Sequence, residues 1–308
     1  MTRFLALLAT ALPLLAATSP ASASPPGKPQ VPAGMTASYA VFDRQTGRVT
    51  LYRNAHRKFR SASVVKIMIA IDYLESHSSV PPRDLALLKA MLRISDDHAA
   101  TSFWTRSGQG KIIERMARKL QLTDTTPPPA NLPGFWGYTS LSALDVVRTY
   151  RYLLDRADPK VSGLILGHLR KAGQCGSDGF DQYFGIPRGV TGPWAVKQGW
   201  SGYGPTPPVR CEQTAAPGAA PVLSPAQDVA ASPGSAPAGA AAGATAGTAV
   251  SSPVPDFGHP VLHTTGLVGP GERWIMVLLT AHPSGTTWQR STGQVTKLAK
   301  EVYLSGTS

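Results

Sequence analysis

Apolar and polar residues alternate with the two-residue period of β-strands near both ends of the chain. This alternation runs through 38–43 and 48–53, on either side of the turn at 44–47, and predicts a β-hairpin. Towards the C-terminus, strand character returns at 194–197, 261–265 and 274–280, and the last two of these segments flank a glycine-rich turn. The pattern over 289–304 then predicts a final helix.

The middle of the chain spaces its apolar residues at three and four, which is the period of α-helices. Helices are therefore expected over 84–94, 97–106, 110–120, 142–154 and 161–171. A further helix from Ser63 to Leu74 is apolar almost all round, so we expect it at the centre of a domain. The long irregular segment 122–138 between two of these helices is more typical of a functional loop than of a simple connection.

Strands at both ends with helices between them predict a two-lobed α/β fold. In this fold one antiparallel sheet is built from both termini, and an α-helical lobe, about 62–185, is inserted into it. The domain is expected over 36–308, after a proline-rich leader at 24–35. Residues 212–255 are dominated by Ala, Pro, Gly, Ser and Thr without an aromatic residue, and we expect a disordered insertion there.

The first residues have the pattern of a secretory signal peptide. Arg3 precedes the apolar run 4–17, and Ala21-Ser-Ala23 matches a cleavage site, so residues 1–23 are expected to be removed. The absence of a cysteine near that site argues against a lipid anchor, and no later segment is long and apolar enough to span a bilayer. We therefore expect a secreted, extracellular protein that is released or is retained by the cell wall.

The composition narrows the expected partners. The net charge is +12, but the basic residues are dispersed and do not interleave with aromatics, so nucleic acid is not expected and an anionic cell envelope is. The only two cysteines, Cys175 and Cys211, predict one disulfide in an oxidising compartment. No ligand spacing suggests a metal or another cofactor, and we expect a monomer.

Ser63 and Lys66 are the first candidates for chemistry. Residues three apart share a face of a helix, so the Lys66 amine can reach the Ser63 hydroxyl, and burial would lower the pKa of the amine and favour its role as a base. Taken alone, the same tetrad is also explained by a serine cap before an ordinary core helix with a snorkelling lysine.

Two further motifs follow in order along the chain and change this balance. Together, Ser63-Val-Val-Lys66, Ser95-Asp-Asp97 and Lys197-Gln-Gly199 resemble the Ser-x-x-Lys, Ser-Asp-Asn and Lys-Thr-Gly elements of the penicillin-recognising serine hydrolases. This family contains the class A β-lactamases and the D-alanyl-D-alanine peptidases. The resemblance covers roughly residues 36–308 apart from the insertion, and it implies the two-lobed fold of that family.

By position, the resemblance assigns the chemical roles. It implies that Ser63 attacks a carbonyl and forms an acyl-enzyme, that Lys66 accepts its proton, that Ser95 relays protons to the leaving nitrogen, and that Lys197 supplies positive charge. The backbone N–H groups of Ser63 and Trp200 would form the oxyanion hole. The residues expected to line the substrate site are Asp97, Gln198, Gly199, Trp200 and Tyr203, with Gly199 letting the substrate approach the strand.

Departures from the family pattern qualify the expected activity. Asp97 stands where the family has asparagine, and its carboxylate would favour the charged form of Lys66. Gln198 replaces the hydroxyl residue of the third motif, and no glutamate lies between Glu114 and Glu212 to activate a deacylating water. We therefore expect an enzyme that is acylated by β-lactams or peptidoglycan-like peptides and is deacylated slowly. The alternative is a weak or inactive relative that binds wall fragments or a partner protein.

Overall fold

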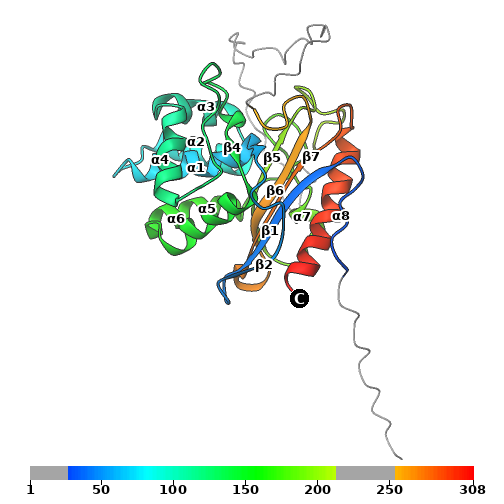
Figure 1. Cartoon of the computed structure of the whole chain (residues 1–308). Helices are drawn as coiled ribbons and strands as arrows, with labels where there is room; N and C mark the ends of the chain where they lie inside the picture. Colours follow the sequence, from blue (N-terminus) through cyan, green and yellow to red (C-terminus); the bar gives the residue numbers. More distant parts are fainter. Residues whose placement is uncertain (1–26, 213–253) are drawn as a thin grey trace, which may run out of the picture.

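The structure, a computed structural model, describes residues 27–212 and 254–308. The expected signal peptide lies outside the described residues, as does all but the edges of the expected insertion. Figure 1 shows a molecule of helices and strands, with a helical lobe on one side of a twisted sheet and a long C-terminal helix on the other.

One antiparallel sheet of five strands forms the centre of the molecule. Its order is β2-β1-β7-β6-β5, so the first strand lies beside the last. The strands are β1 (Thr36–Asp43), β2 (Arg48–Arg53), β5 (Trp194–Ser201), β6 (Val261–Val268) and β7 (Trp274–Ala281). The predicted assembly of one sheet from both termini is confirmed.

The helical lobe packs on one face of this sheet. Its helices are α1 (Lys66–Glu75), α2 (Pro82–Arg93), α3 (Asp97–Arg106), α4 (Gly110–Leu120), α5 (Ala143–Asp155) and α6 (Pro159–Leu169). α1 contacts α2, α3, α4 and α6, and all its residues from Lys66 to Leu74 are buried. The predicted central helix and the five other predicted helices are confirmed. The bounds of α3 and α4 are those predicted, and the ends of the other four helices differ by one to three residues.

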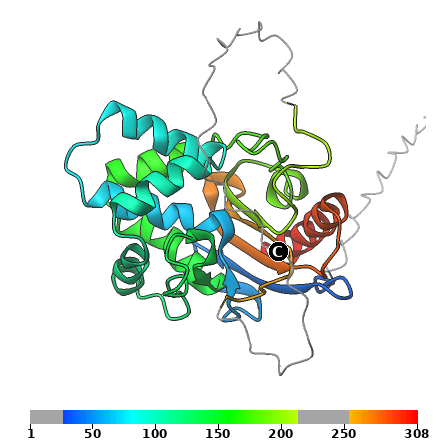
Figure 2. The same ribbon diagram turned by 90° about the horizontal axis from the view of Figure 1, so that it is seen from above.

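The opposite face of the sheet is covered by α8 (Trp288–Gly306) and by the single turn α7 (Ile186–Gly189), as the view from above in Figure 2 shows. The sheet therefore separates two apolar cores, one shared with the helical lobe and one shared with α7 and α8. The sequence pattern did not predict α7, because its Ile-Pro-Arg-Gly sequence is too short for a helical period.

Two short elements bring the start of α1 to the edge of the sheet. β3 (Phe59–Arg60) pairs with β4 (Ser140–Leu141), which holds the end of the 122–138 segment beside the approach to α1. A 3₁₀ turn, η1 (Ala62–Val65), then leads into α1 and contacts β5. The residues at the start of α1, the end of the 122–138 segment and β5 therefore meet where the two lobes join.

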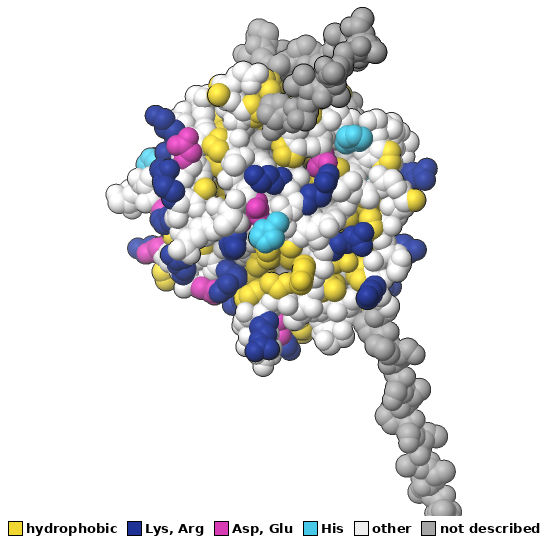
Figure 3. All heavy atoms as spheres, in the orientation of Figure 1, with side chains coloured by type: hydrophobic (Ala, Val, Ile, Leu, Met, Phe, Trp, Pro, Cys, Tyr) yellow, Lys and Arg dark blue, Asp and Glu magenta, His cyan; other side chains and the backbone are white. Residues whose placement is uncertain are grey.

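The predicted disulfide is present. Cys175 and Cys211 are bonded with their Cα atoms 5.4 Å apart, which ties the loop before α7 to the segment after β5. Within 27–212 and 254–308, no helix is long and apolar enough to cross a membrane. On the face seen in Figure 3, lysine and arginine side chains are scattered and do not gather in one patch.

Candidate active site

Ser63 lies in a cavity at the junction of the two lobes. Its residue surface is only 6 % exposed, yet its side chain lines the cavity, and none of the described residues forms a hydrogen bond with its Oγ. The preceding Ala62 has a φ of 43°, a strained value for alanine, which turns the chain into η1. The local backbone therefore presents an unbonded hydroxyl to a small cavity that is open to solvent on one side.

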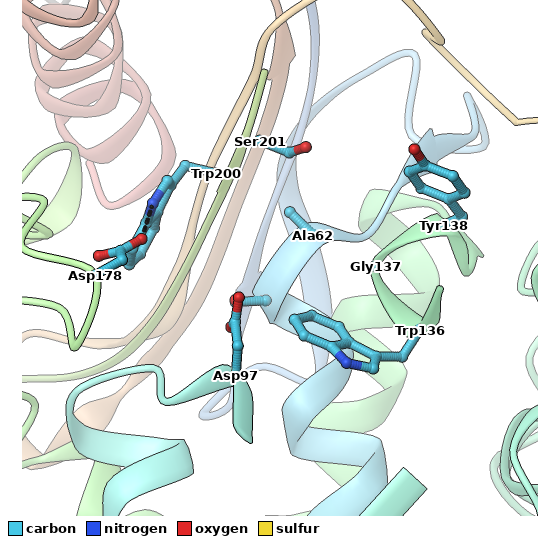
Figure 4. Close-up of a pocket in the computed structure, with 9 residues that line it drawn as sticks. Ala62, Asp97, Trp136, Gly137, Tyr138, Asp178, Trp200 and Ser201 are labelled. Atoms are coloured by element: carbon cyan, nitrogen blue, oxygen red, sulfur yellow. Dashed lines mark hydrogen bonds between the residues drawn. The ribbon is translucent and has the colours of Figure 1, made fainter. Parts of the chain in front are cut away.

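The cavity has a volume of about 130 Å³. The residues around it come from η1, α3, the end of the 122–138 segment, the loop before α7, and β5: Ala62, Ser63, Asp97, Trp136, Gly137, Tyr138, Asp178, Trp200 and Ser201. In Figure 4, Asp178 and Trp200 lie on one side, Trp136 and Tyr138 lie on the other, and Asp97 lies between them.

Lys66 lies directly behind this cavity with a fully buried side chain. Its Nζ donates to Ser95 O at 2.6 Å, to Asp97 Oδ1 at 2.6 Å and to Ser95 Oγ at 3.2 Å. These three acceptors match the three donors of an ammonium group. The predicted contact between Lys66 and the Ser63 hydroxyl is not among the hydrogen bonds of the described residues, because the amine is engaged with the second motif instead.

Two opposing effects act on the Lys66 amine. Burial lowers the pKa of Lys66, while the charge and the hydrogen bond of Asp97 raise it and offset part of that shift. The predicted influence of Asp97 on the charge of Lys66 therefore has a direct geometric basis in the ion pair.

The second motif combines backbone strain with helix capping. Ser95 has a φ of 58°, which directs both its carbonyl and its hydroxyl to Lys66. Asp96 then caps α3, since its Oδ1 accepts a hydrogen bond from Ala99 N at 2.7 Å. Asp97 follows as the first residue of α3 and faces the cavity.

Lys197 completes a chain of polar groups. Its Nζ donates to Ser95 Oγ at 2.9 Å, so one hydroxyl contacts both buried amines. Burial, together with the charge of Lys66, lowers the pKa of Lys197 well below its ordinary value. The structure thus brings together Ser95, Lys66 and Lys197, which are far apart in the sequence, immediately behind Ser63.

Asp178 is a cavity residue that the sequence analysis missed. Its Oδ2 accepts a hydrogen bond from Trp200 Nε1 at 2.9 Å and its Oδ1 accepts one from Phe180 N at 3.1 Å. Burial raises the pKa of this carboxyl, and the two hydrogen bonds oppose the shift. Asp178 belongs to none of the three motifs, and only its position three residues after Cys175 could have drawn attention to it.

The 122–138 segment supplies the opposite wall. The ring of Trp136 lies over Lys66 Nζ, 4.7 Å from the ring centroid, and its Nε1 donates to Thr101 Oγ1 at 3.1 Å. The start of the segment is held by Asp145, a fully buried carboxylate on α5 that accepts from Asp124 N at 2.7 Å. This long loop therefore reaches the cavity.

Three residues expected at the substrate site do not line the cavity. Gln198 Nε2 donates to the carbonyls of Gln182 and Phe184, so its side chain points to the α7 side of the sheet. Tyr203 packs edge-on against Trp288 with ring centroids 5.1 Å apart. These two side chains pack the second core, which corrects their predicted place in the site.

Gly199 needs a different correction. A Cβ at this position would lie 3.1 Å from Ser61 O and 3.2 Å from Ser63 N. The bare face of Gly199 therefore lets the Ser63 turn approach β5, and the predicted approach of substrate to this glycine has no support in the geometry.

Comparisons with known proteins identify the fold that carries this site. No protein-family model matches the chain. A search of solved structures found PBP-A, with a TM-score of 0.58 and 14 % identity over 88 % of this chain and 90 % of that one. A class A β-lactamase from Mycobacterium abscessus has a TM-score of 0.56 and 16 % identity over 89 % of this chain and 95 % of that one. The chain has the fold of the penicillin-recognising serine hydrolases.

This fold was expected from the three motifs and is now confirmed by the likeness to solved structures over 88–89 % of the chain. Among curated proteins, the chain resembles "Putative lipoprotein LppW" of Mycobacterium tuberculosis, with 38 % identity over 175 residues. The match covers 54 % of each protein, so the chain spans about half the length of the curated relatives it matches. At 14–16 % identity, the structural likeness to this hydrolase fold defines the architecture and leaves the chemistry to the site itself.

Proposed function

We propose that this protein is an exported serine hydrolase that forms an acyl-enzyme at Ser63 with β-lactams or peptidoglycan-like peptides. The observation that supports this proposal most is the unbonded Ser63 hydroxyl in a small cavity, with Lys66, Ser95 and Lys197 joined behind it. Two buried amines that share one hydroxyl are costly to maintain in a protein interior. Such groups cluster where protons have to be moved.

In the proposed acylation, Ser63 Oγ attacks the carbonyl carbon of an amide or a β-lactam. Its proton passes to the neutral amine of Lys66, and the C–O bond forms as the negative charge collects on the carbonyl oxygen. The backbone N–H groups of Ser63 and Trp200 would stabilise that oxygen. When the C–N bond breaks, Ser95 delivers a proton to the leaving nitrogen and is itself reprotonated by one of the two lysines that it contacts.

This sequence of steps makes the charge of Lys66 the main obstacle to acylation. As an ammonium paired with Asp97, Lys66 cannot accept a proton. Acylation therefore requires the fraction of molecules in which the Lys66 amine is neutral, a fraction that burial increases and Asp97 decreases.

Deacylation is expected to be slow, because it requires a base that activates water. The carboxylates that line the cavity are those of Asp97 and Asp178, and both already accept hydrogen bonds from neighbouring groups. Incubation with a chromogenic cephalosporin should give at most about one equivalent of product quickly, followed by a slow phase. Rapid hydrolysis through many cycles would contradict this expectation.

Labelling with a fluorescent penicillin tests the proposed nucleophile. The wild-type protein should take up the label covalently, and the Ser63→Ala variant should lose it. A Ser79→Ala variant, which removes the same hydroxyl from an exposed loop between α1 and α2, should label like the wild type. Equal labelling of the Ser63→Ala variant would mean that another residue reacts and would refute the assignment.

A second candidate function is non-catalytic binding of wall fragments or of a protein partner through the same cavity. It is favoured by the complete engagement of the Lys66 donors and by the small volume of about 130 Å³. Loss of covalent labelling in Ser63→Ala, with labelling retained in the wild type, would exclude a binding-only protein.

Export to the cell envelope is part of the proposal. It is supported by the disulfide, which persists in oxidising compartments, and by the likeness to a relative named as a lipoprotein. The net charge of +12 would favour retention near an anionic envelope surface.

A further inference from the structure

The charged side chains that line the cavity are all acidic. Among the described residues around it, Asp97 and Asp178 are carboxylates, and none is a lysine or an arginine. The two nearby lysines lie behind the wall with fully buried side chains, where Lys66 is paired with Asp97 and Lys197 has a strongly lowered pKa. A group that enters the cavity therefore meets negative charge before it meets positive charge.

The two carboxylates differ in what balances them. Asp97 has the ammonium of Lys66 at 2.6 Å. Asp178 receives hydrogen bonds only from neutral groups, the indole N–H of Trp200 and the backbone N–H of Phe180, and no lysine, arginine or histidine among the described residues forms an ion pair with it. Asp178 is thus the lining carboxylate without a counter-charge of its own.

Aromatic rings surround the same space. Trp200 lies beside Asp178 and Trp136 lies across the cavity from it (Figure 4). The Trp136 ring already accepts an ammonium on its face, since Lys66 Nζ lies 4.7 Å from its centroid. Indole faces and carboxylates together are the groups that proteins use to bind organic cations.

We propose that the cavity selects substrates that carry an ammonium group close to the carbonyl attacked by Ser63, and that Asp178 is the specificity-determining carboxylate. This inference rests on the proposed acyl transfer and concerns its substrate class. A substrate whose nearby groups are neutral or anionic would approach a carboxylate that has no ion-pair partner and would react more slowly.

Benzylpenicillin and ampicillin provide a matched pair of probes, because they differ by one α-amino group. Acylation rate constants should be measured by mass spectrometry in single-turnover experiments at about pH 6, where an α-amino group is protonated. The wild type should react with ampicillin roughly tenfold faster, as expected for one carboxylate–ammonium pair partly screened by water. The Asp178→Asn variant should react with both penicillins at similar rates.

The Asp178→Asn substitution is chosen because it should leave the fold intact. Asparagine at 178 retains a side-chain oxygen that can accept a hydrogen bond from Trp200 or Phe180. Asp181→Asn is the control: it removes the same charge from the same loop, at a carboxylate that pairs with Arg188 outside the cavity. The ampicillin preference should persist in this control.

An equilibrium measurement separates failure of this inference from failure of the proposed function. In the Ser63→Ala background, tryptophan fluorescence should report tighter binding of benzylammonium than of benzyl alcohol, with the difference lost when Asp178→Asn is added. Acylation of the wild type without any ampicillin preference would overturn the inference and leave acyl transfer standing. If neither penicillin acylates the protein, the proposed function fails, and equal binding of the two benzyl ligands would overturn the cation preference independently.

Discussion

Replacing Asp97 by asparagine should increase the rate at which Ser63 is acylated at neutral pH. The substitution removes the carboxylate that pairs with Lys66 Nζ at 2.6 Å and retains a side-chain oxygen of the same shape. Because an anion stabilises the ammonium form, its removal lowers the pKa of Lys66 further, in the direction in which burial already moves it. More molecules then carry the neutral amine that acylation requires.

The size of the effect follows from the separation and the exposure of the pair. The Asp97 side chain is 68 % exposed, so a water-like dielectric is appropriate. At the 2.6 Å between Lys66 Nζ and Asp97 Oδ1, the attraction between the two charges is then about 1.6 kcal/mol. This energy corresponds to about one unit in the pKa of Lys66. The acid limb of the acylation profile should therefore move about one pH unit lower, and the rate below the Lys66 pKa should rise about tenfold.

The assay is the second-order rate constant for covalent labelling by a fluorescent penicillin, measured across the pH range for the wild type and Asp97→Asn. Asp155→Asn serves as the control, because it removes the same charge from the exposed end of α5. Its profile should coincide with that of the wild type. An unshifted limb in Asp97→Asn, or a shift towards higher pH, would refute the role given to the ion pair.

Two other predictions concern stability and the cavity wall. Asp145→Ala should lower the free energy of unfolding by about 3 kcal/mol, because it leaves buried donors of the 122–138 segment without their acceptor. Chemical denaturation measures this free energy. A decrease no greater than that caused by Asp155→Ala would contradict the prediction. Reduction of the Cys175–Cys211 disulfide should speed hydrogen exchange in the loop that carries Asp178 and in β5 more than in α1, and equal exchange in all three would refute that coupling.

Much of the architecture could be predicted because it depends on local periodicity. The apolar spacing of α1 reflects burial on all sides, and every residue from Lys66 to Leu74 is buried as that pattern requires. The assembly of the sheet from both termini followed from the distribution of strand and helix signals along the chain. The short elements η1, β3, β4 and α7 were missed, since two to four residues cannot display a period.

The residues that form the site were predicted better than the contacts between them. The three motifs identified the groups that meet behind Ser63. They did not show that the Lys66 amine donates to Ser95 and Asp97 and not to Ser63. The left-handed backbone at Ser95, which directs its carbonyl to Lys66, is not marked by any pattern in the sequence. Strand alternation could have separated Gln198 from its neighbours Lys197 and Gly199, because adjacent residues of a strand face opposite sides of the sheet.

Asp178 illustrates a different limit. Its place in the cavity results from tertiary packing of the loop after Cys175 against Trp200, and neither spacing nor composition marks such a residue. The electrostatic character of the cavity could therefore be judged only in part from the motifs: they supply Asp97, but not Asp178, the other charged side chain among the described residues that line the cavity.

The most direct test of the central claim is the intact mass of the protein followed over time after mixing with benzylpenicillin. We predict an increase by the mass of one penicillin, located on the peptide that contains Ser63, which persists long after free penicillin is removed. A protein whose mass never changes, or an adduct that maps to a peptide without Ser63, would contradict the account.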